Sequence, residues 1–236
     1  MSSSNFFSSH KPKILRALFT ATLIYPVSSW GFQGPYVGGH AGLAFMDGIH
    51  KYTNGAGQEG KTVLKQFGYG AGLQGGYMQY VGDSKGIIGG EITLTMMGLN
   101  NNNELIIPGN PVEGKFSIRH RYVLGLGIFG GAVLNPKVMT YVKVSMENNH
   151  VMVTYSNLSF QTPSTEKFSL KLRNFVPALG GLFKMTPHML LGLEYGYSMM
   201  PKKTLRRDDT ILNGARRGYT FNINEHRLLA RFLYIF

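Results

Sequence analysis

The chain has 236 residues, of which 31 are glycine and none is cysteine, and it carries a formal net charge of +12. Charged residues make up 15% of the sequence, against roughly 25% in ordinary soluble domains, and a hydrophobic content of 43% is too low for a bundle of membrane helices. The absence of cysteine excludes a disulfide scaffold, a thiolate metal site and a cysteine nucleophile.

Residues 1–29 have the pattern of a secretory signal peptide. A basic segment with Lys11 and Lys13 leads into a mostly apolar stretch at 14–27, and the small residue Ser29 follows. About 14 apolar residues are too few for a spanning helix. We therefore expect cleavage near residue 29 and a mature domain at 32–236. Because we expect the protein to be exported, we expect no nucleic-acid partner despite the basic charge.

Eight later segments alternate between two kinds of side chain with a period of two, which predicts β-strands. In the fourth, Leu124, Leu126 and Ile128 share one face, while Arg119 and Arg121 share the other with glycines. The predicted strands span 35–46, 65–80, 87–99, 115–133, 138–146, 168–184, 189–198 and 219–236.

The gaps between these segments alternate between long and short, at roughly 18, 6, 15, 4, 21, 4 and 20 residues. Tight turns on one side and long loops on the other are typical of an outer-membrane barrel. We therefore predict an all-β fold, an eight-stranded antiparallel up-and-down transmembrane barrel. A further extended segment at 151–160 is interpreted as a hairpin arm of the third outer loop, following a turn at 148–150. A ten-stranded barrel is the alternative for this region.

The last strand carries the most specific motif. Phe232, Tyr234 and Phe236 alternate up to the final residue, which resembles the C-terminal signature of bacterial outer-membrane β-barrels. The glycine-rich opening at 34–42 resembles the first strand of small barrels related to the outer-membrane protein A barrel and the opacity surface proteins. The resemblance implies recognition of the three aromatic residues by the barrel-assembly machinery. It also implies a location in the bacterial outer membrane and relatives that include envelope-stabilising proteins, adhesins and surface antigens.

The charged face of the strands predicts a plugged lumen. A soluble barrel of the lipocalin kind would point its polar face outward. Here the oily residues suit lipid, whereas glycines and charges suit the narrow centre of an eight-stranded barrel. Counting up from the short turns puts four charged residues at one depth, where burial requires that they pair. We predict a salt-bridged layer of Glu91, Lys143, Glu194 and Arg231, with upper layers formed by Arg227, Arg119, Arg121 and Arg173.

The last outer loop, predicted at 201–218, is strongly basic. Arginine and lysine near an outer leaflet can pair with lipid phosphate, so we regard this loop as a candidate headgroup site, with solvation or adhesion to acidic polymers as alternatives. Its cations are Lys202, Lys203, Arg206, Arg207, Arg216 and Arg217. The expected partners are outer-membrane lipid including lipopolysaccharide, the assembly machinery and an extracellular ligand of the outer loops, with the barrel itself a monomer.

Candidate catalytic groups are sparse. His40, His120, His188 and His226 lack a serine and an acid nearby in the predicted strands, and the sequence has no metal-ligand spacing. We therefore expect neither enzymatic activity nor a cofactor, and predict a structural or surface-interaction protein. A narrow channel for small solutes and a lipid-modifying enzyme are the competing hypotheses.

Overall fold

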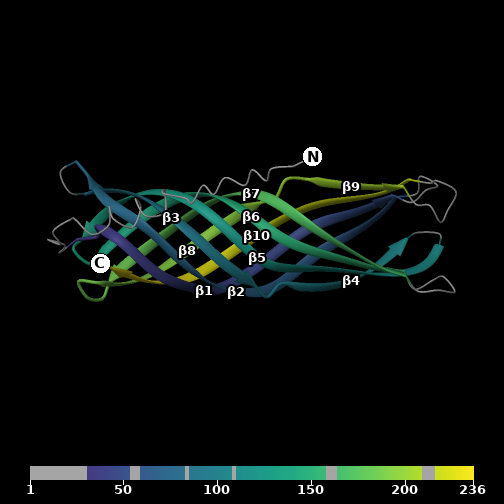
Figure 1. Cartoon of the computed structure of the whole chain (residues 1–236), viewed down its shortest axis with the longest axis horizontal. Helices are drawn as coiled ribbons and strands as arrows, with labels where there is room; N and C mark the ends of the chain where they lie inside the picture. The colour runs from purple at the N-terminus through teal and green to yellow at the C-terminus, as the bar shows by residue number, and fades with distance from the viewer. Residues whose placement is uncertain (1–30, 54–58, 83–84, 108–109, 158–163, 209–215) are drawn as a thin grey trace, which may run out of the picture.

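The computed structural model describes residues 31–236 except 54–58, 83–84, 108–109, 158–163 and 209–215, so the predicted signal segment lies outside the described residues. The described residues form ten strands (Figure 1). No helix among them is long and apolar enough to cross a membrane. The strands are β1 (Gly34–Thr53), β2 (Glu59–Val81), β3 (Gly86–Met97), β4 (Asn100–Ile107), β5 (Asn110–Asn135), β6 (Val138–Asn157), β7 (Ser164–Lys184), β8 (Met189–Met199), β9 (Lys203–Asp208) and β10 (Arg216–Ile235).

The strands pair into one closed antiparallel ring. The order is β1-β2-β3-β5-β6-β7-β8-β10, and β10 pairs with β1 to close it. Strand β4 continues the line of β3 along β5, and β9 continues the line of β8 along β10, each after a short break. The barrel therefore has eight strands around its circumference. This confirms the predicted eight-stranded up-and-down barrel over the ten-stranded alternative.

The barrel is longer than the sequence pattern predicts. Strands β1, β2, β5, β6, β7 and β10 each have 20 to 26 residues, although about 9–11 are enough to cross a bilayer. The end with the short turns, which also carries the start of β1 and the end of β10, is called the lower end (left in Figure 1). The excess length extends beyond the opposite, upper end.

Three predicted loops are strands in this extension. The asparagine run at 100–103 lies in β4, and residues 203–208 pair with 216–221 as a hairpin. The predicted turn at 148–150 is also wrong, because β6 passes through it and stays paired with β7 up to Asn157. The outward residues of the upper strands are polar, whereas those of the lower half are apolar. The sequence of the upper strands therefore resembled that of loops.

The side chains sort by face as the alternation predicts for the lower half. Large apolar residues point outward and are exposed, and they form a continuous apolar belt around the barrel. Above this belt, toward the upper end, the outward positions become polar, beginning with Asp47, Lys65 and Arg173. Prominent members of the apolar belt are Leu43, Phe67, Leu73, Ile92, Leu126, Ile128, Val142, Met146, Phe175, Leu193, Leu228 and Phe232.

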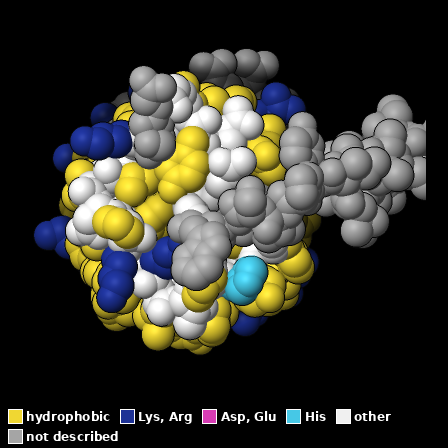
Figure 2. All heavy atoms as spheres, turned by 90° about the vertical axis from the view of Figure 1, so that its left-hand side faces the viewer, with side chains coloured by type: hydrophobic (Ala, Val, Ile, Leu, Met, Phe, Trp, Pro, Cys, Tyr) yellow, Lys and Arg dark blue, Asp and Glu magenta, His cyan; other side chains and the backbone are white. Residues whose placement is uncertain are grey.

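The interior contains two large apolar clusters, with a polar zone and a third, smaller apolar cluster of Ala44, Met97, Leu99 and Val123 between them. The lower apolar cluster lies toward the end that faces the viewer in Figure 2, where many hydrophobic side chains are visible with Lys and Arg side chains among and around them. The upper apolar cluster fills the extension. The lower cluster includes Phe32, Met78, Ile87, Phe129, Met139, Leu182, Leu190 and Leu233, and the upper one includes Met46, Leu64, Ile118, Val151, Val153, Leu170, Leu172, Phe221 and Ile223.

Candidate functional site in the barrel lumen

Four charged side chains meet in the centre of the lumen, and we call them the ionic quartet. Nζ of Lys143 lies 2.7 Å from Oε1 of Glu91 and 2.5 Å from Oε1 of Glu194. Nη1 of Arg231 lies 2.6 Å from Oε2 of Glu194, and its Nη2 contacts Oε2 of Glu91. Each cation therefore joins the same two carboxylates, and the four charges sum to zero. The quartet consists of Glu91 on β3, Lys143 on β6, Glu194 on β8 and Arg231 on β10.

Two tyrosines complete the hydrogen bonding of the quartet from below. The hydroxyl of Tyr36 donates to Oε2 of Glu91 at 3.0 Å, and the hydroxyl of Tyr141 donates to Oε2 of Glu194 at 2.8 Å. Nη1 of Arg231 in turn donates to the hydroxyl of Tyr141 at 2.6 Å. Buried charges are tolerated when their remaining donors and acceptors are satisfied, and this arrangement meets that requirement.

Glycines make room for these large side chains. A Cβ added at Gly180 would lie 2.5 Å from the ring of Tyr141, and one added at Gly72 would lie 2.7 Å from Nε2 of His40. His40 and Gln74 lie near the quartet: they line one small cavity with Lys143 and Glu194, and Nε of Arg231 donates to Oε1 of Gln74 at 3.1 Å. The glycine content thus has a local cause, since the inner faces of the strands must leave space for the plug.

A second ionic cluster lies above the quartet and centres on Arg227. Its Nη1 donates to both carboxylate oxygens of Glu147, at 2.7 and 2.8 Å, and its Nε donates to Oε1 of Glu225 at 2.6 Å. Sequence reasoning predicted Arg227 in an upper layer but missed both carboxylates. Glu147 shares the alternating inner face of Lys143, and Glu225 that of Arg227, so the strand period alone was enough to find them.

The other three arginines predicted to line the lumen point outward instead, so that prediction is wrong for them. Arg119, Arg121 and Arg173 are all exposed on the outer surface. In β5 the pairing with β6 shifts between His120 and Tyr122, so Arg121 is the extra residue of a β-bulge. A bulge reverses which residues point inward. Arg173 shares the outward face of Phe175 on β7, where it stands just above the apolar belt.

The predicted basic loop is only partly a loop. Lys202 is exposed, and β9 pairs with the start of β10 so that Arg217 lies opposite Arg207. Residues 209–215 lie outside the described part, and so do the side chains of Lys203, Arg206, Arg207, Arg216 and Arg217. The C-terminal aromatics point outward from β10, with Phe232 and Tyr234 each 42% exposed and Phe236 52% exposed.

No protein-family model matches the sequence, and no curated protein matches it. Among solved structures, the outer membrane protease OmpT of Escherichia coli matches with a TM-score of 0.52 and 8% identity, over 85% of this chain and 97% of that one. The outer membrane protein OprG of Pseudomonas aeruginosa matches with a TM-score of 0.49 and 12% identity, over 89% and 99% of the two chains. The Neisserial surface protein A matches with 0.43 and 16%, over 86% and 97%.

Two observations decide the fold: the structural match to OmpT, and the pairing of β1 with β10, which closes the ring of strands. The chain has the fold of a bacterial outer-membrane β-barrel. In such barrels the short turns lie on the periplasmic side and the longer connections face outward. The lower end of this barrel, which carries the short turns, matches the periplasmic end of that fold, and the extension matches its outward-facing end.

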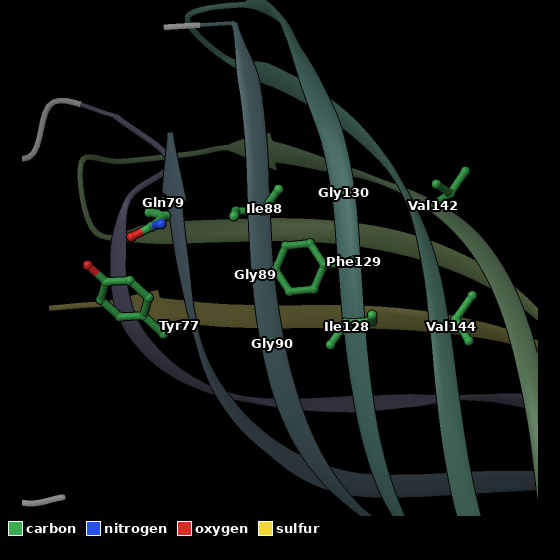
Figure 3. A pocket seen from close by; sticks show the side chains of 10 residues that line it. All are labelled: Tyr77, Gln79, Ile88, Gly89, Gly90, Ile128, Phe129, Gly130, Val142 and Val144. Atoms are coloured by element: carbon green, nitrogen blue, oxygen red, sulfur yellow. The ribbon is translucent and has the colours of Figure 1, made fainter. Parts of the chain in front are cut away.

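One hollow of the barrel lies on the outer wall. It is a groove of about 670 Å³ across β2, β3, β5 and β6, and Figure 3 shows its lining side chains. Ile128 and Val142 on its walls are 70% and 68% exposed, and Gly90 and Gly130 leave it open. Within the lumen, a cavity of about 30 Å³ lies between the two ionic clusters, which is room for about one water molecule.

His226 has an acid and a tyrosine as neighbours. Its Nε2 lies 3.9 Å from Oδ1 of Asp47, and its Nδ1 lies 2.6 Å from the hydroxyl of Tyr195. These side chains are on the outer wall at the upper edge of the apolar belt. Tyr197 packs against the histidine ring, with centroids 4.8 Å apart. No described serine or cysteine contributes a nucleophile to this group, and the described residues hold no cluster of three metal-ligating side chains.

Proposed function

We propose that the protein is an integral outer-membrane barrel with a sealed lumen, and that it acts as a structural or surface-interaction protein. The observation that carries the proposal is the stacking of four filled layers along the axis. From the lower end these are the lower apolar cluster, the ionic quartet, the Arg227 cluster and the upper apolar cluster.

The layers argue against a channel because each excludes ions for a different reason. A hydrated ion gains nothing from the apolar clusters, whereas in the quartet every cation already contacts two carboxylates. Passage would require breaking buried pairs and opening both apolar ends. Desolvation costs of several kcal/mol per ion make such a path slow. We expect no steady conductance from the resting barrel.

The extension supports a role at the cell surface. Its interior is packed with Ile118, Leu172 and Phe221, and the hollow among these residues is only about 10 Å³. A filled barrel is a stiff support, and it presents the connections between its strands to the exterior. We infer that extracellular ligands or neighbouring envelope components contact these connections. The same packing supports a non-enzymatic role, since the hollow among these residues is too small to hold a substrate.

The decisive experiment combines localisation with conductance. The full chain is expressed in a Gram-negative host, and its membranes are fractionated and run on gels with and without boiling. We expect sedimentation with outer membranes and a mobility shift on heating. The purified barrel should then give no steady current in planar bilayers. A soluble periplasmic protein would refute the membrane assignment, and regular open channels would refute the sealed lumen.

A further inference from the structure

The outer wall just above the apolar belt carries a compact group of cations on β5 and β7. We call Arg119, Arg121, Lys171 and Arg173 the basic patch, and all four are exposed. On β7 the outward residue immediately below Arg173 is Phe175, which is 48% exposed and belongs to the apolar belt. The patch therefore begins where the belt ends, at the depth of lipid headgroups in a barrel embedded by that belt.

The β-bulge of β5 is what creates this patch. Without the extra residue at Arg121, the alternation that points Leu124 outward would direct Arg119 into the lumen. With it, His120 lies in the lumen at 3% exposure, and both arginines stay on the outer wall. Tyr122, beside the bulge, stacks on His150 of β6 with ring centroids 4.6 Å apart. Bulges commonly re-aim side chains, and here the result is two outward guanidinium groups.

The cations lie on both sides of β6, because β6 pairs with β5 on one side and with β7 on the other. Lys171 lies opposite His150, and Arg173 lies opposite Asn148. Neighbouring strands are about 4.8 Å apart, so β5 and β7 lie about 10 Å apart across β6. Arginine and lysine side chains on β5 and β7 are long enough to extend toward each other over β6 on the outer wall. The polar Asn148 and His150 between them offer further hydrogen-bonding groups.

No acid neutralises the patch within the described part of the chain. None of its four members makes an ion pair there, and the described outward residues of β5, β6 and β7 include no carboxylate. The opposite side of the barrel differs, since Lys65 on β2 lies directly opposite Asp47 on β1. Unpaired, converging cations at a membrane interface attract an anion, and guanidinium groups match phosphate oxygens in geometry.

We propose that the basic patch binds the phosphate of a phosphorylated lipid in the outer leaflet. The inference rests on the proposed outer-membrane placement and names a lipid partner for it. The site differs from the basic hairpin at 201–218 that the sequence suggested. Its ligand enters with acyl chains against the apolar belt below Arg173 and with its phosphate between β5 and β7.

The test counts lipid molecules that stay on the barrel. The full chain is reconstituted in phosphatidylcholine nanodiscs containing diphosphoryl lipid A, transferred to mild detergent and analysed by native mass spectrometry. We compare R121Q/K171Q/R173Q with K51Q/K61Q/K65Q, which removes three exposed outward lysines from the other side of the barrel. We expect at least about a tenfold loss of retained lipid A in the patch variant, because two or more charge-assisted contacts are removed. The control should stay within twofold.

Three outcomes would overturn the inference: retention by the patch variant equal to that of the parent, equal losses in both variants, and equal retention of lipid A stripped of its phosphates. A soluble polyanion as the true ligand would show as binding of inorganic polyphosphate without retained lipid. The conservative variant R121K/R173K keeps the positive charges, so it should retain most of the lipid A that the parent retains. A mobility shift on heating and outer-membrane sedimentation are checked for every variant, so failure of the barrel itself is distinguished from failure of the phosphate site.

Discussion

Lys143 on β6 and Glu91 on β3 lie on strands that are not neighbours in the ring, yet Nζ and Oε1 are 2.7 Å apart in the centre of the lumen. The strand between them, β5, has Gly127 at this level, directly opposite Glu91. A Cβ on Gly127 would lie 2.5 Å from Oγ of Ser145. The contact across the lumen thus depends on both the charges and the absence of a side chain beside them.

Removing one member of the quartet should be costly. Lys143→Met leaves two buried carboxylates with one cation, and breaking a buried pair in this way costs about 3–5 kcal/mol. We expect the free energy of unfolding, measured in urea for the barrel refolded in detergent, to fall by that amount. Lys137→Met, at an exposed turn, is the matched control and should change it by less than about 0.5 kcal/mol.

The quartet should also behave as a unit. Glu91→Gln combined with Lys143→Met removes two partners of one network, so the double variant should lose clearly less stability than the sum of the single variants. The same unfolding measurements give this coupling. Strict additivity would mean that the two residues do not share a network.

A substitution on the apolar belt tests the orientation of the wall. Leu126, 64% exposed at the centre of β5, should not tolerate arginine, because a cation on the lipid face near the bilayer midplane costs about 2–4 kcal/mol. Val63, 58% exposed above the belt between two lysines, should tolerate arginine with little effect. The fraction of heat-shiftable barrel in outer membranes measures both. Equal assembly of the two variants would contradict the membrane orientation.

Two glycines with opposite surroundings test the packing of the plug. Gly180→Val should destabilise the barrel by about 1–3 kcal/mol or more, because its side chain would overlap the ring of Tyr141. A Cβ added at Gly130 on the outer wall has its nearest neighbour at 3.9 Å, so Gly130→Ala should be nearly neutral. Comparison of their urea midpoints gives the result, and similar losses in both would point to a shared backbone requirement instead.

The two apolar clusters predict how conductance responds to mutation. Glu91→Ala removes part of the quartet but leaves Ile118 and Phe221 in the upper cluster, so this variant alone should remain closed. Glu91→Ala combined with Ile118→Gly and Phe221→Ala should also show no steady current in planar bilayers, because the lower apolar cluster and the Arg227 cluster are still in place. Steady channels in Glu91→Ala alone would indicate that the upper cluster does not seal the barrel.

Lumen residues close to the short turns could be predicted from the sequence, whereas several of those farther away could not. Glu91, Lys143 and Glu194 could be located by counting because the register shift nearest the short turns, between Val133 and Asn135, adds its extra residue to β5 and not to the strands that carry these three residues. Arg119 lies beyond a bulge that leaves no clear mark in the alternation. Counting past it therefore gave the wrong face.

Charge was also an unreliable guide to the lumen near the upper end. Arg173 was assigned inward because it is charged, although the period of β7 groups it with the outward Phe175. Above the belt, water replaces lipid, and outward charges cost nothing there. Residues such as Leu170 and Leu172 then supply the inner face. The alternation itself continues, but the chemistry of the two faces is reversed, so the strand ends were missed.

The members of the quartet come from β3, β6, β8 and β10, and the Tyr36 hydroxyl reaches it from β1. An unclosed sheet cannot bring these groups together, so a barrel open at the seam between β1 and β10 would expose uncompensated ions at bilayer depth. We therefore expect neutralisation of the quartet and closure of the ring to occur together during assembly. Intermediates that stall before this step are penalised, which favours an all-or-none insertion of the finished cylinder.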